Sequence, residues 1–141
     1  MNEITTVGTL IEYGGKILTL LRSKEETYPE TWGLAAGRLE EGEDPVKTAI
    51  REIQEETGYV AAGTDLEDLG VSTWTLPAYT VIFHTFRLRL QSPIEITLNQ
   101  EEHTAYDWKT PEDILRLDNP ILGLQELIKQ HYFSEETEGN K

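Results

Sequence analysis

Residues 37–59 read GRLEEGEDPVKTAIREIQEETGY, and this run carries the most informative pattern of the chain. Its glycine, charged and aliphatic positions follow the order G-x5-E-x7-R-E-(aliphatic)-x-E-E-x-G, filled by Gly37, Glu43, Arg51, Glu52, Ile53, Glu55, Glu56 and Gly58. The order places three carboxylates and an arginine on one short helix beside a loop. Carboxylate oxygens bind hard divalent cations, and such cations bind phosphate oxygens. The run therefore predicts a site that holds divalent metal against a diphosphate.

Both ends of this helix are marked in the sequence. Asp44 suits the N-cap, because its carboxylate can accept a hydrogen bond from a free backbone N–H of the first turn. Pro45 suits the first helical position, and Gly58 suits the left-handed residue that follows a helix. The sequence predicts a helix over residues 45–57.

The predicted helix has two different faces. One stripe is apolar and consists of Val46, Ala49, Ile50 and Ile53. The carboxylates share another face and are Glu52, Glu55 and Glu56. Like charges one turn apart repel, and a divalent cation removes that repulsion. This face suits Mg²⁺ (or Mn²⁺), and the alternative is an acidic, solvated surface relieved by Arg51 and Lys47.

Composition limits the class of protein. The chain has 141 residues, of which 38% are hydrophobic and 27% charged. This predicts one domain over residues 1–133 and a disordered acidic tail over residues 134–141. The sequence contains neither a long apolar run nor a signal peptide pattern, so we expect a cytoplasmic protein with no membrane span. Zero cysteines exclude disulfides, thiolate nucleophiles and Cys-based zinc sites.

The formal net charge of −14 argues against binding to duplex nucleic acid, because the electrostatic contribution would be repulsive. Small anionic substrates remain compatible with this charge. Bound cations reverse the local field of a carboxylate cluster, so an acidic site can still hold a diphosphate.

Elsewhere, short apolar segments alternate with turns. They occupy residues 3–13, 16–21, 32–36, 71–76, 79–90 and 105–108. The Gly-Gly pair at 14–15 predicts a hairpin, and Gly37 is expected to start the loop before the helix. The Thr-Pro pair at 110–111 and the Asn-Pro pair at 119–120 each supply an N-cap and a first helical residue. The apolar side of the last helix would consist of Leu122, Leu124, Leu127 and Ile128. Strands and helices together predict an α/β fold.

The run over residues 37–59 resembles the box of the Nudix hydrolase family, and residues 3–133 match that family's order of elements more loosely. The resemblance implies an α/β/α sandwich with a central mixed β-sheet. It implies catalytic roles for Glu55 and Arg51, and structural support of the site from Glu43 and Gly58. The metal ligands that it implies are the backbone carbonyl of Gly37 and the carboxylates of Glu52, Glu55 and Glu56.

The chain departs from the family pattern at two places. Relatives often have Pro-Gly before the box glycine, where this chain has Ala35-Ala36, and an aliphatic residue where it has Tyr59. Neither departure removes a ligand. The first alters the loop beside the metal site, because alanine tolerates fewer backbone conformations than glycine. The second is a change of packing.

The resemblance also implies a distal glutamate on a loop that follows the central strands. Relatives often carry it in a Glu-His pair before an aromatic-rich strand, and Glu102-His103 resembles that pair. Glu102 is the candidate, as a ligand or as general base on the water, and Glu101 is its rival. We interpret His103 as a loop or packing residue, and His84 and His131 as structural.

Substrate recognition is less evident in the sequence. Arg38, beside the proposed metal loop, is the candidate for substrate binding, and Arg22 is a second candidate for a phosphate contact. The aromatic residues that could stack on a base are Tyr28, Trp32, Trp74 and Tyr79.

By this resemblance, we hypothesise a Mg²⁺- or Mn²⁺-dependent pyrophosphohydrolase in which metal-activated water attacks a small-molecule nucleoside diphosphate derivative. A possible homodimer is also implied. One alternative is a non-catalytic Nudix-like sensor that binds a nucleotide, and another is an isoprenoid diphosphate isomerase, against which the absence of cysteine counts. Mutagenic nucleotides, nucleotide sugars, dinucleoside polyphosphates, ADP-ribose and a pterin precursor all remain open as substrates.

Overall fold

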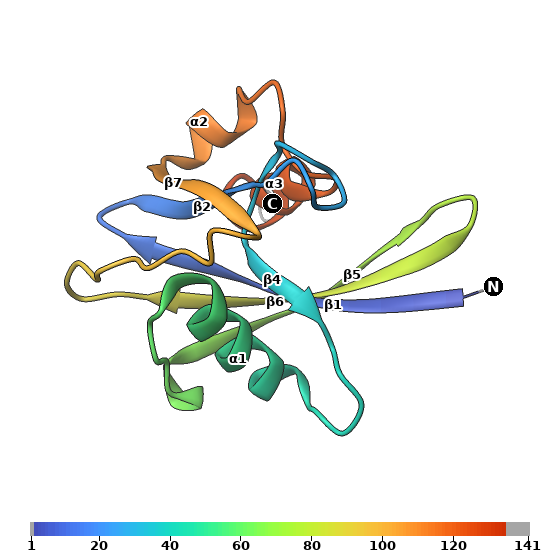
Figure 1. Cartoon of the computed structure of the whole chain (residues 1–141), viewed down its shortest axis with the longest axis horizontal. Coiled ribbons are helices and arrows are strands. Elements are labelled where there is room, and N and C mark those ends of the chain that lie inside the picture. The colour runs from blue at the N-terminus through green and yellow to red at the C-terminus, as the bar shows by residue number, and fades with distance from the viewer. Residues whose placement is uncertain (1, 135–141) are drawn as a thin grey trace.

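Strand β1 (Asn2–Tyr13) lies at the centre of a mixed sheet in the computed structural model, which describes residues 2–134 (Figure 1). It pairs in parallel with β6 (Tyr79–Arg89) from Asn2 to Glu12, and antiparallel with β2 (Lys16–Arg22) and β4 (Ala35–Arg38). The remaining strands are β3 (Trp32–Gly33), β5 (Leu66–Thr75) and β7 (His103–Lys109). The path through the sheet is β3-β2-β1-β6-β5, with β4 added to β1 and β7 added to β2.

The helices cover both faces of this sheet (Figure 1). Helix α1 (Pro45–Thr57) lies on one side, and α2 (Pro111–Leu115) and α3 (Leu124–Tyr132) lie on the other. A 3₁₀ turn (Gly63–Asp65) leads into β5. The predicted α/β/α sandwich with a central mixed sheet is therefore confirmed. Within residues 2–134, none of the helices has the length and apolar character needed to cross a membrane.

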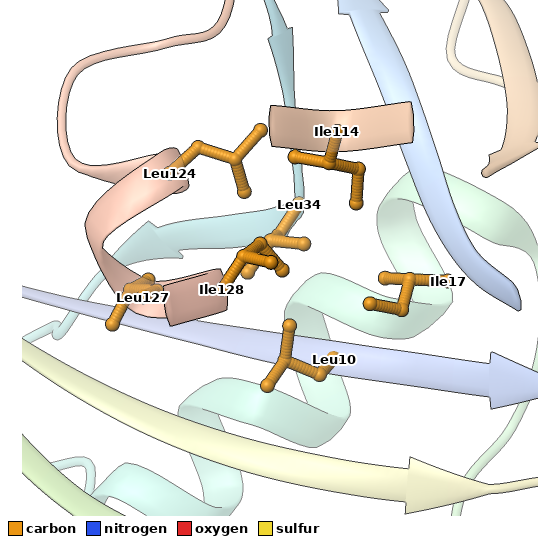
Figure 2. Close-up of a cluster of buried hydrophobic side chains, with 7 residues drawn as sticks. All are labelled: Leu10, Ile17, Leu34, Ile114, Leu124, Leu127 and Ile128. Atoms are coloured by element: carbon orange, nitrogen blue, oxygen red, sulfur yellow. The ribbon is translucent and has the colours of Figure 1, made fainter. Parts of the chain in front are cut away.

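Alternation along β1 explains the two layers. Successive side chains of a strand point to opposite faces, so Leu10 and Ile11 enter different cores. Ile11 packs on the α1 side with Ile53, and Leu10 packs on the α3 side. Figure 2 shows the second of these cores, whose members are Leu10, Ile17, Leu34, Ile114, Leu124, Leu127 and Ile128. The buried apolar area holds both layers on the sheet and so fixes where α1 lies.

Helix α1 begins and ends where the sequence predicts. The Asp44 side chain accepts a hydrogen bond from the backbone N–H of Lys47 at 2.9 Å, and Pro45 is the first helical residue. Gly58 has φ +84° and closes the helix through a backbone bond to Gln54. These local hydrogen bonds satisfy backbone groups that would otherwise be left free at the helix ends.

The hairpin expected at the Gly-Gly pair is confirmed, whereas two other expectations about the strands need correction. The predicted hairpin is present, but β1 and β2 pair at only two positions, because β4 and β6 take most of β1's hydrogen bonds. Gly37 does not start the loop; it lies within β4, opposite Val7. Strand β5 begins at Leu66 rather than at residue 71, because its pairing with β6 extends as far as Leu66, which lies opposite Leu88.

A helix starting at Asn119-Pro120 is wrong. The Asn119 carbonyl accepts from Trp32 N–H at 2.9 Å, and its amide donates to the Glu30 carbonyl at 2.9 Å, so this segment is held against the loop before β3. Helix α3 begins only at Leu124, after Gly123 in the left-handed region. Leu122 therefore lies outside the helix and is 49% exposed. Of the predicted tail, residues 135–141 lie outside the described part of the chain.

Candidate active site

Strand β4 crosses α1 and brings Gly37 against the carboxylates of the helix. Pairing with Val7 of β1 sets the position of Gly37. A Cβ built on Gly37 would lie 2.1 Å from Oε2 of Glu52, which is far inside van der Waals contact. Only glycine leaves room for the carboxylate to approach the backbone this closely. The box glycine therefore forms a cradle for Glu52.

Glu52 and Glu56 lie one turn apart on α1, and both are buried, with exposures of 8% and 4%. Oε1 of Glu56 accepts a hydrogen bond from the Ala36 backbone N–H at 3.0 Å. Burial raises the pKa of Glu52, and burial followed by the contact with Glu52 raises the pKa of Glu56 well above its ordinary value. Two adjacent buried carboxylates are unfavourable unless a proton or a cation lies between them. The pair is suited to a divalent cation.

The third helix carboxylate has a different environment. Glu55 is exposed over 54% of its side chain, and its Oε1 lies 3.4 Å from Arg51 Nη1. The sequence correctly places the three glutamates on one side of α1. It does not show that β4 covers two of them and leaves Glu55 open to solvent.

Arg51 connects the loop before α1 to the carboxylate face. Its Nε donates to Glu43 Oε2 at 2.7 Å and its Nη2 to Glu43 Oε1 at 3.0 Å, which is the bidentate geometry that arginine forms with carboxylates. Nη1 donates to Glu52 Oε2 at 2.7 Å, and Nη2 donates to the Arg38 carbonyl at 3.2 Å. Arg51 thus orients Glu52 and ties β4 to the helix.

Glu43 is held by Arg51 and by Thr48, whose hydroxyl donates to Glu43 Oε1 at 2.8 Å. The Arg51 guanidinium, more than any other group, lowers the pKa of Glu43 from 4.5 to about 2. Since the folded state holds this proton more weakly than the unfolded state, the stabilisation is full above about pH 4.5 and declines as pH falls towards 2.

We expect Glu43→Gln to lower the urea midpoint at pH 7, and the difference from wild type to shrink as pH falls from 4.5 towards 2. Urea unfolding followed by circular dichroism across this range measures it. Glu40→Gln is the matched control, because Glu40 lies 3.6 Å from the same Arg51 but is 64% exposed and should change the midpoint little. A constant difference between wild type and Glu43→Gln at all pH values would contradict the assignment.

The turn before β7 brings a distal carboxylate to the helix. Ligand atoms of Glu56, Glu102 and His103 all lie within 4.8 Å of one another. Burial raises the pKa of Glu102, and the charges of Glu26, Glu52 and Glu55 raise it further, so Glu102 faces the carboxylate cluster. Its rival, Glu101, is exposed and contributes its backbone carbonyl to the Ser23 hydroxyl at 3.0 Å. The geometry favours Glu102 as the distal carboxylate.

The burial of His103 is compatible with its interpretation as a loop or packing residue. His103 is 3% exposed, and burial lowers its pKa to about 4, with the charge of Arg22 adding to the effect, so its ring is neutral at neutral pH. Its nearness to Glu56 comes from the pairing of β7 with β2, which no local pattern reveals.

A cleft of about 310 Å³ opens beside the cradle. It is lined by Gly37, Arg38 and His103, and by residues of β1, β6 and the segments around α3. Its aromatic lining consists of Tyr28, Trp74, Tyr79 and Phe83. Its lining is mainly apolar, and Gly37 and His103 place the cleft beside the carboxylate cluster.

Most of the predicted recognition residues line this cleft. Arg38 is exposed at its edge, and Arg22 also lines it but donates to the carbonyl and hydroxyl of Thr27 at 2.7 and 2.9 Å. Trp32 does not line this cleft; Lys109 Nζ lies 3.5 Å from its ring centroid instead. Phe83 was missed, although its period-two spacing with Tyr79 on β6 is a signal that would have found it.

The donor set is compatible with the cofactor predicted from the sequence. Glu52 and Glu56 are buried next to each other, the Gly37 cradle keeps space for Glu52, and Glu102 approaches from a second element. Carboxylate oxygens of this kind suit hard cations such as Mg²⁺ and Mn²⁺. The residues therefore fit a divalent metal.

Comparison with known proteins agrees with this arrangement. The family model of the NUDIX domain matches residues 3–129. An ADP-ribose pyrophosphatase of Bacillus subtilis (strain 168) is 33% identical over 106 residues, which cover 73% of this chain and 56% of that protein. An octanoyltransferase of Myxococcus xanthus is 34% identical over 105 residues, which cover 70% of this chain and 28% of that protein. The chain thus spans only part of these curated relatives.

A solved structure shares the fold over nearly the whole chain. The crystal structure of the MutT protein from Methanosarcina mazei Go1 matches with a TM-score of 0.78 and 24% identity, covering 98% of this chain and 97% of that chain. The sheet and helices described above are therefore those of a known fold.

Proposed function

This chain belongs to the Nudix family, and from that premise we propose that it hydrolyses a diphosphate bond in a nucleoside diphosphate linked to a second group, with the help of Mg²⁺ or Mn²⁺. The observation that carries the proposal is the gathering of Glu52, Glu56 and Glu102 beside the Gly37 cradle. A bound divalent cation supplies the charge that neutralises the diphosphate and lowers the pKa of a water molecule.

The chain's own residues then have distinct roles. Glu52 and Glu56 would hold the cation, and the Gly37 carbonyl would be a further oxygen ligand. Arg51 holds Glu52 in place through the 2.7 Å contact. Glu55 and Glu102 come from different elements and provide the remaining carboxylates, for ligation or for accepting the proton of the attacking water. Arg38, at the edge of the cleft, contacts the diphosphate.

The cleft supports an aromatic group as part of the substrate. Four aromatic side chains line it, and bases stack well on such rings. Because the curated relative from Bacillus subtilis is an ADP-ribose pyrophosphatase, ADP-ribose is the first compound to test.

The test is a substrate panel with Mg²⁺ and with Mn²⁺, in which both products are identified. The panel contains ADP-ribose, a nucleotide sugar, a dinucleoside polyphosphate and an oxidised nucleoside triphosphate. We expect one class to be cleaved at its diphosphate bond with a kcat/KM well above the others, and no cleavage after chelation. Saturable binding without product for every member, even with excess Mn²⁺, would favour the sensor function and contradict the proposal.

Replacement of Tyr28 tests the aromatic lining of the cleft. Tyr28 has φ +51°, which asparagine tolerates, so Tyr28→Asn removes the ring with little backbone strain. Loss of one stacking partner is expected to raise KM about tenfold with kcat nearly unchanged, since stacking contributes equally before and during reaction. Tyr106→Asn is the control, because Tyr106 is similarly exposed (45% against 43%) but lies on β7 and does not line this cleft. An unchanged KM in Tyr28→Asn would remove Tyr28 from the substrate site.

A further inference from the structure

Glu56, Glu102 and His103 meet where α1 approaches the start of β7. Each offers one ligand atom, and these atoms lie within 4.8 Å of one another. Glu56 lies on α1, whereas Glu102 lies in the turn before β7 and His103 is the first residue of that strand, so only the folded chain brings them together. From this group we infer that His103 is a nitrogen ligand of a divalent cation, which it holds together with Glu56 and Glu102.

The state of the His103 ring is the second observation. His103 is 3% exposed, and its Nδ1 is fully buried without a hydrogen-bond partner among residues 2–134. Buried polar atoms in folded proteins nearly always have a partner. A histidine kept there only for packing would be unfavourable, whereas a neutral imidazole beside two carboxylates is a common metal donor set.

The backbone around His103 holds the ring in place. The N–H of His103 donates to the Asn99 carbonyl at 2.9 Å, and the Ser23 N–H donates to the Glu102 carbonyl at 2.8 Å. Arg22 on β2 is the strand partner of His103. The turn is thus anchored at both sides, which is the rigidity expected of a prepared ligand site.

A nitrogen donor changes which metal is preferred. Carboxylates alone serve Mg²⁺ well, but imidazole binds Mg²⁺ poorly and binds first-row transition ions more tightly. The group of Glu56, Glu102 and His103 should therefore prefer Mn²⁺, Fe²⁺ or Co²⁺ to Mg²⁺. The inference deepens the proposed function, and rests on it only in assuming that the acidic cluster binds metal.

The test uses Mn²⁺ bound to the full chain and pulsed electron paramagnetic resonance, which detects nitrogen coupled to the ion. The chain has three histidines, so in the double variant His84→Gln/His131→Gln the single remaining histidine is His103. We expect a ¹⁴N coupling in wild type and in the double variant, replaced by a ¹⁵N coupling when histidine is ¹⁵N-labelled. His103→Gln should lose the coupling, and its preference for Mn²⁺ over Mg²⁺ in equilibrium dialysis should fall about tenfold.

Two results would overturn the inference: no histidine nitrogen coupling at saturating Mn²⁺ in the double variant, or a coupling that persists in His103→Gln. If His103→Gln does not fold, the labelled double variant still decides. Nitrogen coupling without hydrolysis of any substrate would leave the metal ligand standing and remove the proposed function. Hydrolysis without nitrogen coupling would support the proposed function and remove His103 as a metal ligand.

Discussion

Glu55→Gln should lower the rate of diphosphate hydrolysis by about three orders of magnitude and leave the fold unchanged, since a positioned acid or base alone contributes about 10²- to 10⁴-fold. The fold is expected to survive because the Glu55 side chain is 54% exposed and contacts Arg51 only weakly, at 3.4 Å. Product formation on the best substrate of the panel, with circular dichroism as the check on folding, measures both effects.

A matched control separates the role of Glu55 from a general change of charge. Glu41→Gln removes one negative charge from an exposed residue in the loop before α1, and should leave turnover near wild type. Metal titration then shows which role Glu55 has. A lower Mn²⁺ affinity marks it as a ligand, and an unchanged affinity marks it as the proton acceptor. Unchanged turnover would contradict the site assignment.

Gly37→Ala should have the second large effect, with turnover reduced about 100-fold, as expected when a catalytic group is displaced by about 1 Å. The new Cβ would lie 2.1 Å from Oε2 of Glu52 and 2.2 Å from its Cδ, so the carboxylate must move. Because the displaced atoms are the end of a flexible side chain, stability should fall little. Turnover and Mn²⁺ affinity measure the effect on the site, and the urea midpoint measures the effect on stability.

Gly15→Ala is the contrasting control. Gly15 has φ +81° in the β1–β2 turn, and a Cβ there would meet nothing within 4 Å among the described residues. Alanine should therefore reduce stability through backbone strain and leave turnover unchanged. If Gly37→Ala instead lost stability and kept full turnover, Gly37 would be important for packing rather than for the position of Glu52.

Local signals account for the parts of the fold that were predicted correctly. Asp44, Pro45 and Gly58 set the ends of α1 through hydrogen bonds and backbone angles within a few residues, and these rules apply before any tertiary contact forms. The Asn119-Pro120 pair shows the limit of the same rules. Its backbone and side chain bond to Trp32 and Glu30, and these long-range contacts replace the expected helix start.

The candidate site divides in the same way. The order of glycine, arginine and glutamates in residues 37–59 was sufficient to indicate the family, the helix and its acidic side, because all these features lie within one continuous segment of the chain. The burial of Glu52 and Glu56 was not in that pattern. It follows from β4, whose position across α1 is set by its pairing with β1.

The approach of Glu102 and His103 to Glu56, and the aromatic cleft beside them, likewise required the folded chain. Sequence periodicity indicates which side of one helix or strand a residue occupies. The pairing of strands determines which distant segments lie next to each other. Register arises from many weak backbone and side-chain contacts between distant segments, so no short pattern encodes it. The sequence alone thus established the carboxylates and the helix that carries them. The pairing of strands in the sheet decided that Glu52 and Glu56 are buried, that Glu102 and His103 lie beside Glu56, and that an aromatic cleft lies next to the site.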